Sequence, residues 1–298
     1  MLFPTSYGMD NTLGKRPIAI YGIFAISLAT SALLLFWVQP LIAKALLPSF
    51  GGVPEVWGGC LIFFQTILLA AYGYVIILNR IRKLGLQAFL HIALLAATAL
   101  LALPLNPGVK QNDWLYNRAP ILSVLAELAF KLGLPAFALA TTSPLLQTWV
   151  ARIYPSLGQS VYSLFAVSNA GSLLATLGYP FLVEPALTIK GQAGVWTWMY
   201  LVYVLAVTTC AGLAWRLGRT PTSMTDQAGS SPDESASKRD SPNGRRWLLL
   251  SAIPTSLLLG VTNYITSTIA PTPLLWLAPL SLYLLAFILA FSSRSRRL

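Results

Sequence analysis

Residues 17–47 read PIAIYGIFAISLATSALLLFWVQPLIAKALL, and no charged residue occurs in this run before Lys44. A helix of these 31 residues would be about 46 Å long at 1.5 Å per residue, whereas the hydrocarbon core of a bilayer is about 30 Å thick. The run therefore predicts a membrane-spanning helix with residues to spare. Because proline disrupts a helix interior, we expect a kink at Pro40 and an interfacial extension over Leu41–Leu47.

Apolar stretches of this kind recur along the whole chain of 298 residues. Hydrophobic residues make up 56% of it and charged residues only 10%, whereas a soluble domain has about 25% charged residues. The sequence therefore predicts an all-α, polytopic transmembrane helical bundle of about eight spans. The predicted spans are Pro17–Leu41, Trp57–Leu78, Leu86–Leu103, Ile121–Thr142, Val161–Val183, Val195–Arg216, Trp247–Thr266 and Pro273–Phe291.

The basic residues alternate between the segments that join these spans. If the N-terminus is cytoplasmic, the inner segments contain 15 of them and the outer segments 4, namely Lys44, Lys110, Arg118 and Lys190. Lys and Arg accumulate on the cytoplasmic side of membrane proteins, so we expect both termini to be cytoplasmic. The net charge of +11 then reflects topology. No basic patch is interleaved with aromatic residues in the way that nucleic-acid binding requires.

One segment interrupts the apolar composition. Residues 220–244 are rich in Ser, Pro, Asp and Gly, and such a stretch cannot bury enough apolar surface to offset its ordering entropy. We therefore expect five parts. They are a cytoplasmic tail (1–16), a six-span bundle (17–216), a disordered cytoplasmic linker (217–246), a two-span hairpin (247–292) and a basic tail (293–298).

Polar residues at membrane depth are costly and are therefore candidates for function. Glu127 and Lys131 are four residues apart, the spacing and order that favour an ion pair on one helix face. Either a self-neutralised structural pair or a coupling site fits this pattern, and the structural interpretation is favoured. Asn169 precedes a small-residue pair, Gly171 and Ala175, which predicts close helix packing with Asn169 hydrogen-bonded across the interface.

Two loops carry further candidates. After the first span, Gly51-Gly52 permits a turn that would let Lys44 pair with Glu55, as a structural clasp or as the mouth of a translocation path. Between the fourth and fifth spans, Ser143-Pro144 is a helix-start signal. It predicts a short helix in the cytoplasmic interface, with Trp149 at the level of the lipid headgroups.

Four blocks of the sequence resemble the membrane module of bacterial spermidine-synthase-like integral membrane proteins, which are fusions with a major-facilitator-like part. These blocks are 39–74, 141–152, 168–185 and 263–287, spread in order over the chain. The matching positions include Gln39, Lys44, Gln65, Gln147, Asn169 and Glu184. The chain departs from the pattern at Asn263 and Thr268, where the family commonly has a His and an Asp.

The resemblance implies a multi-pass protein of the bacterial inner membrane, and it covers only the membrane half of the fused proteins. No nucleotide-binding or nucleophile motif occurs in the sequence, and we expect neither a cofactor nor catalysis. Two functions stay open. The module could transport or shelter a small polar or cationic solute such as a polyamine, or it could anchor a separately encoded aminopropyltransferase-like enzyme as its soluble partner.

The distribution of basic residues generates the first prediction. A reporter protein fused after Leu298 should be active only if it is of the type that works in the cytoplasm, because the positive-inside rule places this end inside. Strong activity of a periplasmic alkaline phosphatase fused at the same position would contradict the eight-span topology.

Overall fold

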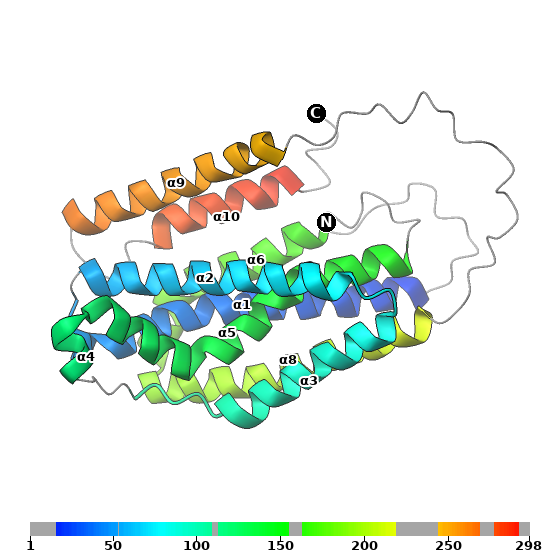
Figure 1. The fold of residues 1–298 in the computed structure, drawn as a ribbon, viewed down its shortest axis with the longest axis horizontal. Coiled ribbons are helices and arrows are strands. Elements are labelled where there is room, and N and C mark those ends of the chain that lie inside the picture. Colours follow the sequence, from blue (N-terminus) through cyan, green and yellow to red (C-terminus); the bar gives the residue numbers. More distant parts are fainter. Residues whose placement is uncertain are drawn as a thin grey trace, which may run out of the picture.

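The computed structural model describes residues 16–52, 54–108, 113–154, 163–218, 244–268 and 277–291, and these contain helices but no strand (Figure 1). The all-α prediction is confirmed for this part of the chain. The helices are α1 (Arg16–Phe50), α2 (Pro54–Asn79), α3 (Leu84–Ala102), α4 (Asp113–Arg118), α5 (Pro120–Ile153), α6 (Ser163–Gly178), the π-helix η2 (Tyr179–Val183), α7 (Glu184–Ala186), α8 (Ile189–Leu217), α9 (Gly244–Thr268) and α10 (Leu277–Phe291).

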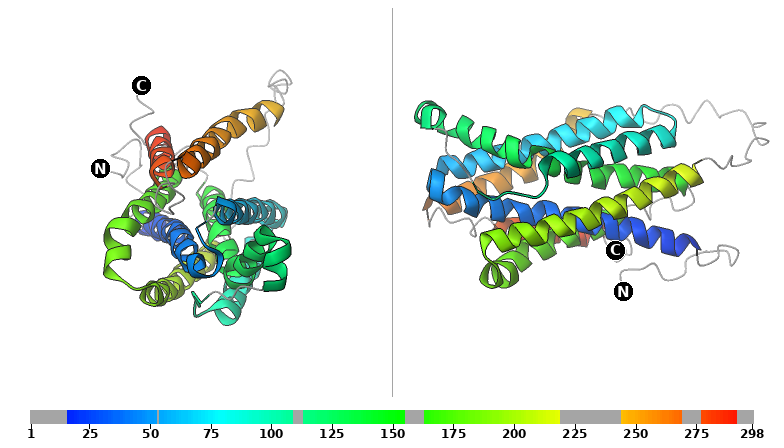
Figure 2. Two further views of the ribbon diagram at one scale, coloured as in Figure 1. Left: turned by 90° about the vertical axis from the view of Figure 1, so that its left-hand side faces the viewer. Right: turned by 90° about the horizontal axis from the view of Figure 1, so that it is seen from below.

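The long helices run back and forth along one axis, as the two perpendicular views also show (Figure 2). Six segments are long and apolar enough to cross a membrane, and these lie in α1, α2, α3, α5, α6–α7 and α8. The apolar parts of α9 and α10 are shorter, at Leu249–Thr262 and Leu277–Phe291. The chain is therefore a multi-pass membrane protein by the length and composition of its helices. The count of eight spans and the orientation of the termini stay predictions.

The two ends of the bundle differ in charge. We call the end where α1 begins, at the right in Figure 1, the basic end, because Arg80, Arg82, Lys83, Arg152 and Arg216 lie there. At the opposite end are the turns between α1 and α2, between α3 and α5, and between α7 and α8. This polarity follows directly from the alternation of basic residues in the sequence.

Helix α1 lies inside the bundle, in contact with α5, α6 and α8. It continues without a break through Pro40 and Pro48 to Phe50. Leu41, Ile42 and Leu46 are at most 1% exposed, so this part of α1 packs against its neighbours, whereas the expected interfacial position of Leu41–Leu47 stays a prediction. Packing on several sides stabilises the helix past the prolines, and this tertiary effect outweighs the local cost of the missing hydrogen bonds.

Aromatic residues of α8 fill the centre of the bundle. The rings of Trp196, Tyr200 and Tyr203 follow one another at centroid distances of 5.1 and 5.2 Å, and all three side chains are fully buried. Trp196 Nε1 donates a hydrogen bond to the carbonyl oxygen of Leu34 in α1, at 2.9 Å. Tyr203 Oη lies 3.1 Å from the carbonyl oxygen of Ala138 in α5. This column of rings therefore joins α8 to both neighbours.

Helix α5 is longer than expected. The predicted interfacial helix after Ser143 is wrong, because α5 continues from Pro120 through Pro144 to Ile153. Trp149 does not face outward, because its side chain is fully buried and its Nε1 donates to Oε1 of Gln87 in α3 at 2.8 Å. A buried indole needs such a partner. The polar partner lies 62 residues away, beyond the reach of local sequence signals.

The last two helices lie on one side of the bundle (Figure 2). Helix α10 packs against α6, whereas α9 contacts α10. Most of the predicted linker, residues 219–243, lies outside the described residues, as do most of the two predicted tails. The ends of the predicted linker are helical instead, because α8 extends to Leu217 and α9 begins at Gly244.

Helices α1 and α6 make one of the closest contacts of the bundle. A Cβ atom added to Gly171 would lie 3.0 Å from both the Cα and the carbonyl carbon of Ala29. Gly171 and Ala175 are both buried, which confirms the close packing predicted from this small-residue pair. Because backbone atoms oppose the glycine, a neighbouring side chain cannot rotate to make room.

The glycine contact generates the second prediction. Gly171→Leu should force α1 and α6 apart and lower the free energy of unfolding by about 1–3 kcal/mol, the usual cost of overpacking. Thermal unfolding in detergent measures the effect. Gly178→Leu in the same helix is the matched control, because nothing lies within 4 Å of its added Cβ. Equal melting temperatures for the two variants would contradict the close contact.

Candidate functional site

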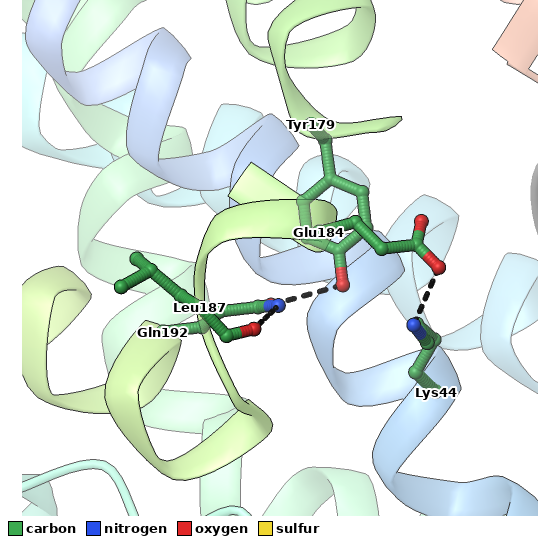
Figure 3. Close-up of polar contacts among 5 residues, drawn as sticks. All are labelled: Lys44, Tyr179, Glu184, Leu187 and Gln192. Carbon is green, nitrogen blue, oxygen red and sulfur yellow. Dashed lines mark hydrogen bonds and ion pairs between the residues drawn. The ribbon is translucent and has the colours of Figure 1, made fainter. Parts of the chain in front are cut away.

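The strongest candidate site lies near the opposite end, where charged side chains of two distant segments meet. Lys44 Nζ, from α1, lies 2.5 Å from Oε1 of Glu184, which begins α7 (Figure 3). The two side chains are 27% and 24% exposed. The structure thus gives Lys44 a partner that the sequence analysis did not name. Glu55 is the second residue of α2, and its side chain lies outside the described part of the structure, so the expected Lys44–Glu55 pair stays a prediction.

The backbone before Glu184 is wound more widely than an α-helix. Pro180 has no amide hydrogen, so it cannot donate the usual hydrogen bond to Thr176. Tyr179–Val183 form a π-helix instead, and the amide of Glu184 donates to the carbonyl oxygen of Tyr179. Tyr179 and Glu184 are five residues apart, and in an α-helix side chains at this spacing point roughly 140° away from each other. The wider turn of the π-helix reduces the angle between these two side chains. π-turns of this kind often occur at functional sites.

Tyr179 connects this turn to the start of α8. Its hydroxyl donates to Oε1 of Gln192 at 3.0 Å, and Nε2 of Gln192 donates to the carbonyl oxygen of Leu187 at 3.0 Å (Figure 3). Tyr179 and Gln192 are each 1% exposed. Thr188 caps α8 by accepting a hydrogen bond from the amide of Gly191 at 3.2 Å. These contacts hold the segment that carries Glu184 in one conformation.

The carboxylate of Glu184 is only partly used. Its Oε1 accepts from Lys44, but its Oε2 is buried and has no hydrogen-bond partner among the described residues. A buried acceptor without a donor is costly, and a carboxylate oxygen accepts readily from an amine, hydroxyl or ammonium group. The site therefore combines a neutralised charge with one acceptor that a small donor could satisfy.

The predicted pair Glu127–Lys131 is confirmed. Lys131 Nζ lies 3.3 Å from Glu127 Oε1, and the side chains are 15% and 18% exposed. Lys131 Nζ also donates to the carbonyl oxygen of Gly108, in the segment that follows α3. The pair thus fastens the beginning of α5 to a loop at the opposite end. This geometry supports the structural interpretation of the pair.

The remaining candidates do not join the Lys44–Glu184 site through any contact that the structure records. Gln147 Nε2 donates to Ser143 Oγ at 3.0 Å, and Ser143 donates to Ser168 Oγ at 3.3 Å, which links α5 to α6. Asn169 Nδ2 donates to the carbonyl oxygen of Phe165 in its own helix at 2.7 Å. The expected hydrogen bond of Asn169 across the interface is therefore wrong.

Two glutamines complete the set of candidates from the sequence. Gln39 is buried in α1, at 7% exposure, whereas Gln65 is exposed on α2. Tyr179 and Gln192 were not among the candidates, although they hold Glu184 in place. Pro180 and Pro185, which flank Glu184 closely, are the signal in the sequence that could have indicated an irregular turn there.

Comparison of the chain with models of protein families, with curated proteins and with solved structures finds no match.

The Lys44–Glu184 pair generates the third prediction. The pair is neither fully exposed nor fully buried. A surface ion pair contributes about 0–1 kcal/mol to stability, whereas removing one partner of a buried pair costs about 3–5 kcal/mol. We expect Glu184→Gln or Lys44→Met to lower the free energy of unfolding by about 1–3 kcal/mol. The first variant leaves the Lys44 ammonium group without its carboxylate, and the second leaves the Glu184 carboxylate without its cation. The double variant should lose less than the two single losses combined.

Chemical denaturation of all three variants in detergent measures this coupling. Lys190→Gln, an exposed lysine at the start of α8, is the matched control and should behave as the wild type. Purely additive losses would show that the two side chains do not stabilise each other.

Proposed function

We propose that this chain is a non-catalytic module of the bacterial inner membrane that anchors and positions a separately encoded soluble enzyme of aminopropyltransferase type. One observation carries the proposal: large side chains close the centre of the bundle. Trp149 of α5 and the α8 residues Trp196, Tyr200 and Tyr203 are fully buried. Their hydrogen bonds join them to α1, α3 and α5. A transport path for a polar solute through the interior would have to pass these rings.

The small polar residues of the core also support an anchoring role. Ser27, Ser31 and Thr141 each donate a hydrogen bond to a carbonyl oxygen of their own helix, three or four residues back. The hydroxyl groups of Thr142 and Tyr203 lie 2.5 Å apart. Groups satisfied in this way offer little to a passing solute, and they suit helices whose role is to pack.

The basic end provides a surface that a soluble partner could contact. Arg80, Arg82, Lys83, Arg152 and Arg216 are all exposed there, and exposed cationic groups steer a partner that carries an acidic patch. The nature of the partner rests on the sequence resemblance to spermidine-synthase-like fusions, in which such an enzyme follows the membrane part. The cytoplasmic location of this end rests on the positive-inside rule.

A second function is favoured by a different observation. The unpartnered Oε2 of Glu184 lies beside the π-turn, and it could hold the amine of a small polar or cationic solute. Lys44 already neutralises this carboxylate, so a neutral or weakly basic donor fits better than a polyvalent cation. This alternative requires solute binding at one end of the bundle and does not by itself require transport.

The fourth prediction separates anchoring from transport. Purified protein in sealed liposomes should accumulate no labelled putrescine above protein-free liposomes, because the closed core offers it no path.

The two native cysteines test in the same sample whether the core is closed, because Cys60 and Cys210 are 6% and 0% exposed. A membrane-impermeant maleimide should leave both unmodified until the protein is denatured. Uptake that Glu184→Gln abolishes would support the solute-binding function and overturn the anchoring proposal.

The partner itself is tested in native membranes. An aminopropyltransferase-type enzyme should co-purify with the chain, and the double variant Arg82→Glu/Lys83→Glu should release it by reversing the charge at the basic end. Lys190→Glu, at the other end of the bundle, is the control and should retain it. An enzyme that stays bound to the charge-reversed protein would place the contact elsewhere.

A further inference from the structure

A groove of about 510 Å³ opens between the start of α3 and the end of α8, at the basic end. Its size falls within the range of about 300–1,000 Å³ that is typical of small-molecule sites. It is far from the Lys44–Glu184 pair, which lies near the opposite end. The groove is lined by Lys83, Leu84, Gly85, Leu86, Ala88, Phe89, Ile92, Ala211, Gly212, Trp215 and Gly218.

Glycines shape the groove. Added Cβ atoms at Gly85 and Gly218 would lie 2.7 Å from the Trp215 ring and 2.6 Å from Leu84 Cδ1, so the two helices meet tightly at these points. At Gly212, in contrast, nothing lies within 4 Å of an added Cβ. The space directly beside Gly212 is therefore open, and because Gly212 lines the groove, a larger side chain there would occupy part of it.

The walls of the groove face outward and are apolar. Leu86, Phe89 and Trp215 are 45%, 66% and 47% exposed, so their outer surfaces lie where the hydrocarbon of a membrane would be. Lys83 is the basic residue in the lining, and Arg82 and Arg216 are exposed at the same end. The combination of an apolar channel with cations at its membrane-surface end matches a molecule with an acyl chain and an anionic headgroup.

No acidic side chain in the described part of the structure neutralises the basic residues beside the groove. Glu127 and Glu184 are the acidic side chains that the structure describes, and both are paired with lysines toward the opposite end. Anionic lipids are attracted to juxtamembrane Lys and Arg, and basic recesses between membrane helices bind their headgroups. We propose that this groove is a binding site for an anionic phospholipid, with one acyl chain along Gly212 and the phosphate at Lys83.

The proposal is tested by native mass spectrometry of the detergent-purified protein with phosphatidylglycerol or phosphatidylcholine of the same acyl chains. Phosphatidylglycerol should bind more tightly. Lys83→Gln should weaken its binding about fivefold, the effect of one basic residue near an anionic surface. Gly212→Phe should weaken it about tenfold, because the ring excludes methylene groups of the acyl chain from the groove.

Two matched controls separate this site from general lipid adhesion. Gly194→Phe introduces the same ring into α8 toward its other end, where nothing lies within 4 Å of the added Cβ, and Lys190→Gln removes an exposed lysine there. Both should bind phosphatidylglycerol as the wild type does. Unchanged melting temperatures confirm that every variant is folded. Equal binding of the two lipids, or wild-type binding by Gly212→Phe, would overturn the proposal.

Discussion

The structure depends on one constraint: hydrocarbon offers no hydrogen bonds, so polar groups at membrane depth need partners within the protein. The long-range hydrogen bonds of the bundle meet this need and join its helices. The indole of Trp196 bonds to the backbone of α1, Tyr203 bonds to the backbone of α5, and Trp149 bonds to Gln87 of α3. Each bond links segments at least 60 residues apart in the sequence, so the same contacts satisfy polar groups and specify which helices are neighbours.

Two exceptions to this constraint involve ionisable groups. Oε2 of Glu184 and both ring nitrogens of His91 are buried without a hydrogen-bond partner among the described residues, as are single atoms of Trp37, Tyr74, Asn79 and Tyr200. His91 is fully buried, lies edge-on to Trp149 with a centroid distance of 6.1 Å, and has the ring of Tyr74 at 6.2 Å. Glu184, in contrast, lies on an irregular π-turn next to a lysine. The difference in surroundings explains why Glu184 is the better candidate for binding, whereas His91 resembles a core residue.

The sequence was sufficient for features that depend on local pattern. The length and composition of the apolar runs predicted the helical membrane fold, and the spacing of Glu127 and Lys131 predicted their ion pair. Features that depend on distant segments were missed. Pro40 was expected to kink a helix and Ser143-Pro144 to begin a new one, but burial against neighbouring helices carries α1 and α5 past these prolines as single helices. The pairing of Lys44 with Glu184 was also missed, because Glu184 is 140 residues away in the sequence.

The central claim is that α1 is a continuous helix buried in a closed bundle, and hydrogen–deuterium exchange in lipid nanodiscs tests it most directly. The decisive amides are those of Leu41–Leu47, because a continuous helix with Leu41, Ile42 and Leu46 buried predicts exchange as slow as that of Leu28–Leu35 in the same helix. The amide of Asn106, an exposed residue of the non-helical loop 103–108, provides the fast reference within the same protein. If the amides of Leu41–Leu47 instead exchange as fast as that of Asn106, α1 does not continue past Pro40 as a packed helix and the central claim is contradicted.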